Sequence, residues 1–270
     1  MHSAGTLNAG PCVRPANQGV IRIDIDRRAS HVGTSQGRSS GVRAPRTIKK
    51  GINMSVEEAL AAARAQIEDY RERIQSLDDN SRDLMFRQAR NHNAWQDRDV
   101  GDDQLREAYD LARMGPTSAN TQPMRIAFIR SKEAKERLNP HVNGPNQEKT
   151  MAAPVTAIIA YDNTFFTDFP KFNPIRPEMA DRFSGNAELA ESFSRIQAIL
   201  QGGYFIMALR AVGLDGGAMG GFNNKAVDEE FFAGTAVKSI FLCNIGYGDV
   251  SGIKGPRLYR YEFDEVCDVL

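Results

Sequence analysis

The sequence predicts an α+β protein, a layered sandwich of helices on a central sheet with one long helix buried in its core. Three observations favour this class. Apolar runs typical of strands, at 125–129, 155–161 and 237–247, alternate with helical patterns but lack the regular rhythm of a doubly wound sheet. The longest helical pattern, 187–212, is apolar nearly all round from its middle onward, as in a buried helix. The 270 residues are enough for one large domain or two small ones.

The first 53 residues differ in composition from the rest of the chain. They hold nine Lys or Arg, two acidic residues and no Phe, Tyr or Trp, so their charge of +7 is offset by −7 in 54–270. Such a segment buries too little apolar area to offset its ordering entropy, so we expect disorder. A transit peptide, a secretory signal or a nucleic-acid arm are alternatives, but there is no amphipathic helix at 21–28 and no apolar h-region. We favour a translation start assigned too far upstream of Met54.

The next segment predicts one extra helix. Ser55 can cap it, and acidic residues follow in its first turn, where the helix dipole favours them. Apolar residues of Val56–Leu77 recur every three or four positions, so we expect one face to be buried. Asp78-Asp79-Asn80 should end the helix. We therefore divide the chain into a basic extension (1–53), an extra helix (54–80) and a main domain (81–270).

The main domain continues with shorter helices between the strands. Further helical patterns cover 82–90, a segment capped by Asp102 or Asp103 and stopped by Gly115-Pro116, then 131–138 and 225–232. The run 155–161 is apolar enough to be covered on both faces, and a loop rich in Phe and Pro is expected at 165–177. Gly202-Gly203 inside the long helix costs roughly 1 kcal/mol for each glycine relative to Ala, which close helix–helix packing would explain.

The composition argues against several functional classes. Lys and Arg balance Asp and Glu at 34 each, unlike a general nucleic-acid binder. No run approaches the roughly 18 apolar residues of a membrane span. Three cysteines and four histidines show no metal-ligand spacing, so we expect no metal site and a reducing cytoplasm. No serine-hydrolase elbow or Walker motif is present, and the glycines of 213–221 follow a helix, unlike a dinucleotide fingerprint.

Polar segments at four places remain as candidate binding sites. They are Arg90–Asn93 (RNHN), Pro116–Pro123 (PTSANTQP), Asn146–Lys149 (NQEK) and Arg257–Arg260 (RLYR). Phosphate prefers bidentate Arg, and a heterocycle with ring carbonyl and N–H groups prefers Asn, Gln and backbone amides, so together they suit a phosphorylated aromatic cofactor. Each segment alone also fits a structural role, as a helix C-cap, a turn before an edge strand or a solvated face, and the glycines fit an ordinary loop.

In this order the segments resemble the FMN-dependent nitroreductase family. The shared motifs are R-x-[SH] at a helix end, P-[ST]-S-x-N-x-Q-P before a strand, N-x-x-K, G-L-D-x-x-x-M-x-G-F and a basic pair near the end, from about Leu84 to Leu270. The octapeptide Pro116–Pro123 is the most specific. Finer motifs resemble the malonic semialdehyde reductases of bacterial pyrimidine degradation; they are 89–95 (ARNHNAW), 115–120 (GPTSAN), 146–158 (NQEKTMAAPVTAI), 231–235 (FFAGT) and 244–249 (NIGYGD).

The resemblance implies a three-layer sandwich with a mixed or antiparallel central sheet, and a homodimer with FMN at its interface. At the phosphate end of FMN, Arg90 would hold the phosphate, helped by Arg257 and Arg260. Asn91 and His92 would contact the phosphate and the ribityl chain.

At the ring end, the same resemblance implies contacts from both subunits. Asn146 and Lys149 would bind the ribityl chain and the pyrimidine edge. The residues that would reach the flavin of the partner subunit are Pro116, Thr117, Ser118 and Asn120. The backbone that would approach flavin N5 and O4 is Ala218, Met219, Gly220 and Gly221, where glycine lets the backbone come close to a ligand.

The implied activity is hydride transfer from NADPH or NADH through FMN to a small-molecule acceptor, most specifically to malonic semialdehyde, which is reduced to 3-hydroxypropanoate. His92 and Arg125 are candidates to meet a substrate carboxylate or donate a proton. A generic reductase of nitroaromatics, quinones or enones is the alternative, and a flavin-binding module without turnover is another. Two departures from the family pattern bear on substrate scope: Met124 replaces an aromatic residue after Q-P, and Ala218–Gly221 lacks the carboxylate of P-x-E-G.

Overall fold

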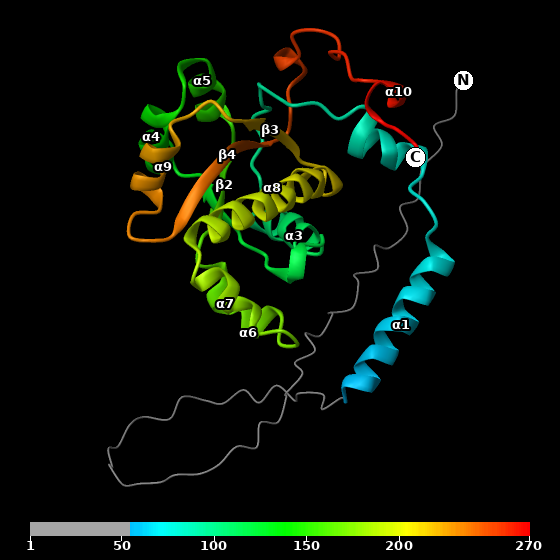
Figure 1. Cartoon of the computed structure of the whole chain (residues 1–270). Helices are drawn as coiled ribbons and strands as arrows, with labels where there is room; N and C mark the ends of the chain where they lie inside the picture. Colours follow the sequence, from blue (N-terminus) through cyan, green and yellow to red (C-terminus); the bar gives the residue numbers. More distant parts are fainter. Residues whose placement is uncertain (1–54) are drawn as a thin grey trace, which may run out of the picture. The chain divides into compact units, whose positions relative to one another are not determined.

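A computed structural model describes residues 55–270 of the chain (Figure 1). The expected disorder of 1–53 falls outside this range. The chain divides into two compact units, one that ends at Leu77 and one from Asp78 to Leu270.

The extra helix is α1 (Val56–Arg73), in the first unit. Its predicted cap is confirmed as a capping box: the Glu58 backbone N–H donates to Ser55 Oγ at 3.2 Å, and the Ser55 N–H donates to Glu58 Oε2 at 2.7 Å. The helix ends four residues earlier than expected, because Ile74 is already extended. Leu60, Ile67 and Tyr70 lie on this helix and are each about half exposed; burial of its apolar face stays a prediction.

Two helices of the second unit differ from prediction at their starts. The segment expected at 82–90 begins earlier, as α2 (Asp79–Arg82), and continues as a π-helical turn (Asp83–Arg87), so Arg90 lies beyond the helix. The helix α3 (Asp102–Ala112) is capped by Gly101 rather than by an aspartate. Asp102 and Asp103 instead lie in its first turn, where negative charge interacts favourably with the helix dipole.

The sheet has four antiparallel strands in the order β1-β2-β4-β3. The three predicted strands are confirmed within two residues; they are β1 (Met124–Ile129), β2 (Val155–Asp162) and β4 (Val237–Gly246). The fourth, β3 (Asp215–Met219), comes from the glycine-rich segment and pairs with β4 at the edge of the sheet. Two of the glycines that fit a loop therefore lie in a strand.

Helices cover both faces of the sheet, so the α+β sandwich has three layers (Figure 1). On one face lie α3 and the long helix α8 (Ala187–Ala211), which confirms the pattern at 187–212. The helices on the other side are α4 (Lys132–Leu138), α5 (Gly144–Ala152) and α9 (Asn224–Phe231). The central strand β2 supplies Ile159 to the core under α8 and Ile158 to the core under α4 and α9, which is why it reads as a continuous apolar run.

The long helix α8 buries one face and exposes another. Ala198, Phe205 and Leu209 are buried against the sheet, whereas Ile196, Ile199 and Leu200 are 58%, 41% and 42% exposed. A Cβ at Gly202 would lie 2.8 Å from Cζ of Phe241 on β4, so this glycine serves helix–sheet packing and not the helix–helix packing we expected. A Cβ at Gly203 would meet nothing within 4 Å in the described structure.

The segment expected as a Phe- and Pro-rich loop folds into short helices. They are a 3₁₀ turn (Phe165–Asp168), α6 (Phe169–Phe172) and, just beyond, α7 (Met179–Ser184). Phe165, Phe169 and Phe183 are buried together in a separate aromatic cluster. A last short helix, α10 (Phe263–Val266), was not predicted either. None of the described helices combines the length and the apolar character needed to cross a membrane.

Candidate functional site

A cavity of about 300 Å³ lies where the chain after the π-helical turn meets the C-terminal segment. Its lining residues are Arg90, Asn91, Asn93, Gly252, Ile253, Lys254, Gly255, Pro256 and Leu258. The Arg90 guanidinium donates to the carbonyl of Gly255 at 2.7 Å, which links the two segments across 165 residues of sequence. Two predicted residues, Arg90 and Asn91, therefore lie together in one cavity.

Positive charges converge beside this cavity. Lys149 Nζ donates to Asn93 Oδ1 at 3.0 Å, and the pKa of Lys149 is lowered, first by burial and then by the positive charge of Lys254. Among residues 55–270, neither lysine nor Arg90 forms an ion pair with an acidic side chain. Like charges held together without a protein counter-ion are suited to binding an anion.

The structure separates the two arginines of the predicted basic pair. Arg257 donates to the carbonyls of Arg87 and Ala89, at 2.8 and 2.7 Å. It therefore binds the backbone just before Arg90, where the π-helical turn ends. Arg260 is exposed and, among the described residues, donates only to the carbonyls of Leu258 and Tyr259 in its own segment. Lys254, which sequence reasoning missed, lines the cavity instead. Its only sequence signal is a lone lysine in the loop after β4.

The strand β3 lies against the segment that contains Asn91 and His92. Asn91 Oδ1 accepts the N–H of Ala218 at 2.7 Å, and the His92 N–H donates to the carbonyl of Gly216 at 3.1 Å. A Cβ at Gly217 would lie 2.6 Å from the backbone oxygen of His92, so glycine is needed for this close approach.

Beyond β3 the chain turns toward α5. Asn146 Nδ2 donates to the carbonyl of Gly221 at 3.2 Å, while the side chain of Met219 is buried in the core. A Cβ at Gly220 would meet nothing within 4 Å among the described residues. The structure thus brings Arg90, Asn91, Asn146, Lys149 and the segment 218–221 into one region.

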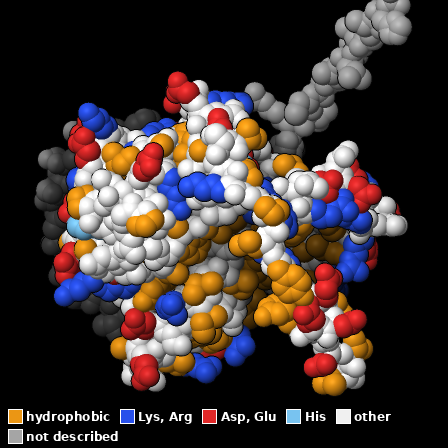
Figure 2. Space-filling model, turned by 90° about the horizontal axis from the view of Figure 1, so that it is seen from above, with side chains coloured by type: hydrophobic (Ala, Val, Ile, Leu, Met, Phe, Trp, Pro, Cys, Tyr) orange, Lys and Arg blue, Asp and Glu red, His pale blue; other side chains and the backbone are white. Residues whose placement is uncertain are grey.

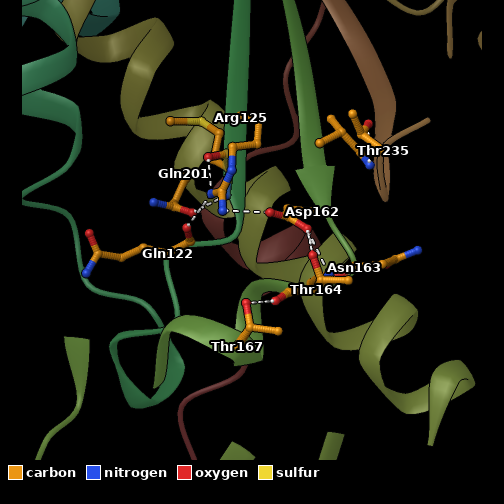
Figure 3. A network of polar contacts seen from close by, with 11 residues as sticks. Gln122, Arg125, Asp162, Asn163, Thr164, Thr167, Gln201 and Thr235 are labelled. Carbon is orange, nitrogen blue, oxygen red and sulfur yellow. Dashed lines mark hydrogen bonds and ion pairs between the residues drawn. The ribbon is translucent and has the colours of Figure 1, made fainter. Parts of the chain in front are cut away.

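Of the two substrate candidates, Arg125 is paired within the protein, whereas His92 is largely buried and its Nδ1 has no hydrogen-bond partner among the described residues. The His92 side chain is 13% exposed, lies 3.5 Å from Asp215 Oδ1, and packs against Gly248. Its ring is not among the groups that line the cavity. Arg125 donates to Asp162 Oδ2 at 2.7 Å, as Figure 3 shows. It also donates to the carbonyl of Met124 at 3.0 Å.

The octapeptide Pro116–Pro123 forms a turn held by α8. The Ser118 N–H donates to Gln197 Oε1 at 2.8 Å, and the N–H of Met124, just after the turn, donates to Gln201 Oε1 at 3.0 Å. Tyr204, one turn further along α8, donates to the carbonyl of Pro116. Among the described residues, none of these bonds joins the turn to the residues that line the cavity.

A larger cavity of about 760 Å³ lies between the start of β4, α9 and α8, and contains no predicted site residue. Tyr161 donates there to Glu191 Oε1 at 3.0 Å, and burial, together with this bond, raises the pKa of Tyr161 to about 12. Lysines pair with acids along the wall, as in Lys238 with Asp228 at 3.9 Å.

Comparison with known proteins identifies relatives over most of the described chain. The model of the nitroreductase family matches residues 87–247. A protein of Burkholderia lata with the provisional name NADH dehydrogenase/NAD(P)H nitroreductase is 46% identical over 194 residues, which are 72% of this chain and 98% of that protein. HadB of Ralstonia pickettii, with the same provisional name, is 48% identical over 185 residues, or 68% of this chain and 94% of HadB.

Solved structures share the fold at lower identity. A nitroreductase-like protein of Exiguobacterium sibiricum, crystallised with FMN, aligns with a TM-score of 0.63 and 18% identity over 73% of this chain and 99% of that one. An enone reductase of gut-bacterial fatty acid saturation aligns with a TM-score of 0.57 and 18% identity, over 72% and 100% of the two chains. Because the family model spans more than half of the sequence and the relatives are matched over nearly their whole length, the chain belongs to the nitroreductase family.

Proposed function

We propose that this chain binds FMN and, as a homodimer, uses NADPH or NADH to reduce a small organic acceptor. The observation that carries the proposal is the convergence of Arg90, Lys149 and Lys254, with no acidic partner in the part of the chain that the structure describes, beside the glycine-rich end of β3. Their charges suit the phosphate and the polar ring edge of FMN, and the open space at Gly220 suits a flat ring packed on the backbone. When bound, FMN supplies hydride-transfer chemistry between a nicotinamide and an acceptor.

The residues of this chain then act by binding and orientation. Arg90 and Lys254 hold the phosphate, while Arg257 secures the carbonyls of Arg87 and Ala89 and so fixes the direction of Arg90. Asn146 and Lys149 bind the polar edge of the ring. Asn91 already fixes the backbone of Ala218, so the end of β3 is rigid where a ring would pack.

The second set of site residues comes from the partner subunit in this proposal. The exposed residues Ile196, Ile199 and Leu200 follow one stripe of α8, and Gly203 continues it with open space. Figure 2 shows apolar side chains in patches between charged ones on one face of the molecule. Contiguous exposed apolar surface marks interaction sites. A copy seated on this stripe would cover it and bring its own turn, with Pro116, Thr117, Ser118 and Asn120, to the flavin.

Two acceptor classes remain as proposals. The sequence motifs favour malonic semialdehyde, reduced to 3-hydroxypropanoate. The ion pair of Arg125 with Asp162 at 2.7 Å and the burial of the His92 side chain, which is 13% exposed, favour a second candidate, a broader reductase of nitroaromatics, quinones or enones, since both features limit the binding of a substrate carboxylate.

The decisive experiment is an anaerobic stopped-flow titration of the purified protein with NADPH and then NADH. Bleaching of the flavin followed by fast reoxidation with malonic semialdehyde supports the first candidate. Reoxidation only by a quinone or nitroaromatic supports the second. A yellow protein that neither nucleotide bleaches would be a flavin-binding module without turnover. Arg90→Ala should purify largely colourless, and full FMN content in that variant would show that the phosphate assignment is wrong.

A further inference from the structure

The turn Thr117–Gln122 stores backbone strain. Ala119, Asn120 and Gln122 have φ of 53°, 57° and 45°, and they are the only non-glycine residues with positive φ in the described part of the chain. A side chain, from its Cβ onward, crowds the backbone in this left-handed region, and Asn tolerates the region better than Ala or Gln. A conformation of this kind persists only where surrounding contacts impose it.

Two asparagine side chains join this turn to the end of α6. Asn173 Nδ2 donates to the carbonyl of Ala119 at 3.1 Å, and Asn120 Nδ2 donates to the carbonyl of Phe172 at 2.8 Å. Each amide thus binds the backbone of the opposite segment, across more than 50 residues of sequence. The bonds act on Ala119 and Asn120, the two adjacent residues in the left-handed conformation.

The end of α6 is itself fixed. The Asn173 N–H donates to the carbonyl of Phe169 at 2.8 Å, and Phe169 is fully buried in the aromatic cluster. The methyl group of Ala119 packs against the same cluster. A partly buried Asn173 therefore connects a rigid anchor to a strained turn. Gln122 Nε2 adds a bond to Asn120 Oδ1 at 3.0 Å, which orients the second amide of the pair.

We infer that Asn173 is a positioning residue of the flavin site: it holds Ala119 and Asn120 in the conformation that the partner's flavin requires. This inference rests on the proposed function, in which the turn reaches the flavin of the second subunit. Asn173 lies outside all the polar segments that the sequence singled out. Its bond to the carbonyl of Ala119 is what assigns it this role.

The test compares full-length Asn173→Asp, which keeps the shape of the side chain but loses the N–H donor, with wild type. Lys171→Ala is the matched control, because Lys171 is exposed on the same helix and makes no hydrogen bond among the described residues. Amide hydrogen exchange of residues 118–122 reports the turn directly. FMN affinity, the visible circular dichroism of bound flavin, and kcat and KM measured separately report the site.

We expect exchange in the turn to rise about tenfold in Asn173→Asp, as for the loss of one hydrogen bond, with FMN affinity reduced by a similar factor and altered flavin dichroism. Lys171→Ala should match wild type in all readouts. Unchanged hydrogen exchange in Asn173→Asp would show that the Asn173 side chain does not hold the turn. Faster exchange with unchanged FMN affinity and dichroism would overturn the positioning role. A wild-type protein that binds no FMN would overturn the proposed function, whatever the exchange data show about the hold of Asn173 on the turn.

Discussion

At the residue scale, two glycines three positions apart have opposite surroundings. Gly217 lies in β3 beside the backbone of His92. A Cβ added to Gly217 would lie 2.6 Å from the backbone oxygen of His92. Gly220 follows the strand, and an added Cβ would meet no described atom within 4 Å. The protein's own packing explains glycine at the first position only, so the second glycine suggests a requirement from a ligand.

This contrast predicts different effects of the same substitution. Gly217→Ala should lower the free energy of unfolding by about 1–3 kcal/mol, as overpacking of a buried site does. Gly220→Ala should leave unfolding within about 0.5 kcal/mol of wild type but weaken FMN binding on the order of tenfold, because the methyl group enters the space proposed for the ring. Urea unfolding and fluorescence titration with FMN measure the two effects. Full FMN affinity in Gly220→Ala would place the ring elsewhere.

The basic residues near the C-terminus give a second prediction at this scale. Lys254→Ala should weaken FMN binding about 10- to 100-fold, as expected for a hydrogen bond to a charged group, because Lys254 lines the cavity. Arg260→Ala should change FMN affinity by about twofold or less, since in the described structure that side chain bonds only to its own segment. Titrations at fixed ionic strength check both, because screening affects each charge. A larger loss for Arg260→Ala would restore the phosphate role that the sequence suggested for it.

At the scale of elements, the sequence predicted the helices and strands whose apolar residues recur with a clear period. Strands β1, β2 and β4 and helices α3, α4, α8 and α9 follow from strong apolar patterns. The short helices α6 and α7 were missed because tertiary burial of Phe169 and Phe183 stabilises them, and no local pattern marks that. The strand β3 was missed because glycine has low strand propensity, and it is formed here by pairing with β4.

The residues of the candidate site likewise divide into those that a local sequence motif marks and those that depend on tertiary contacts. Polar motifs marked Arg90, Asn91, Asn146 and Lys149, because such residue types cluster in recognisable segments. Lys254 and Asn173 had no comparable signal, since their importance depends on contacts with distant segments. The role of Arg125 was likewise open until its pairing with Asp162 was seen.

A buried lysine between α4 and α5 leads us to predict how the free energy of unfolding depends on pH. Lys135, 6% exposed on α4, donates to the carbonyls of Met151 (3.2 Å) and Ala153 at the end of α5, and burial lowers its pKa. Between that lowered pKa and about 10.4, the unfolded chain binds more protons than the folded one, so this residue makes the free energy of unfolding rise with pH. Below the lowered pKa both states are protonated and the dependence vanishes.

Replacing Lys135 should remove that rise. The unfolding free energy of wild type minus that of Lys135→Met should increase as the pH goes from about 8 to about 10, with the steepest part above the lowered pKa. The exposed residue Lys132, at the start of the same helix, provides the control variant Lys132→Met, whose difference from wild type should stay flat. Urea titrations across this range give both curves. A flat difference for Lys135→Met would show that burial does not perturb this lysine.

At the scale of the whole molecule, cofactor binding and association should fail together. Ile199→Glu places a charge in the exposed apolar stripe of α8, so we expect a monomer by light scattering. The monomer should also lose most of its FMN, because the turn Pro116–Asn120 comes from the partner in the proposed assembly. Lys132→Glu, on the opposite side of the sheet, should remain dimeric and yellow. A monomeric Ile199→Glu with full FMN would mean that one chain forms the whole site.

The N-terminal extension gives the last prediction. The family match begins at residue 87, and the Burkholderia lata relative is covered almost completely by 72% of this chain, so more than a quarter of the sequence has no counterpart there. Every site contact described above lies between Arg87 and Arg260. Deletion of residues 1–53 should therefore leave the melting temperature, the FMN content and the dimer unchanged, as calorimetry, absorbance and light scattering can test. Loss of the dimer on deletion would overturn the hypothesis of a start at Met54, because the extension would then contribute to assembly. Loss of FMN with the dimer intact would instead assign the basic segment, with its charge of +7, to the phosphate site.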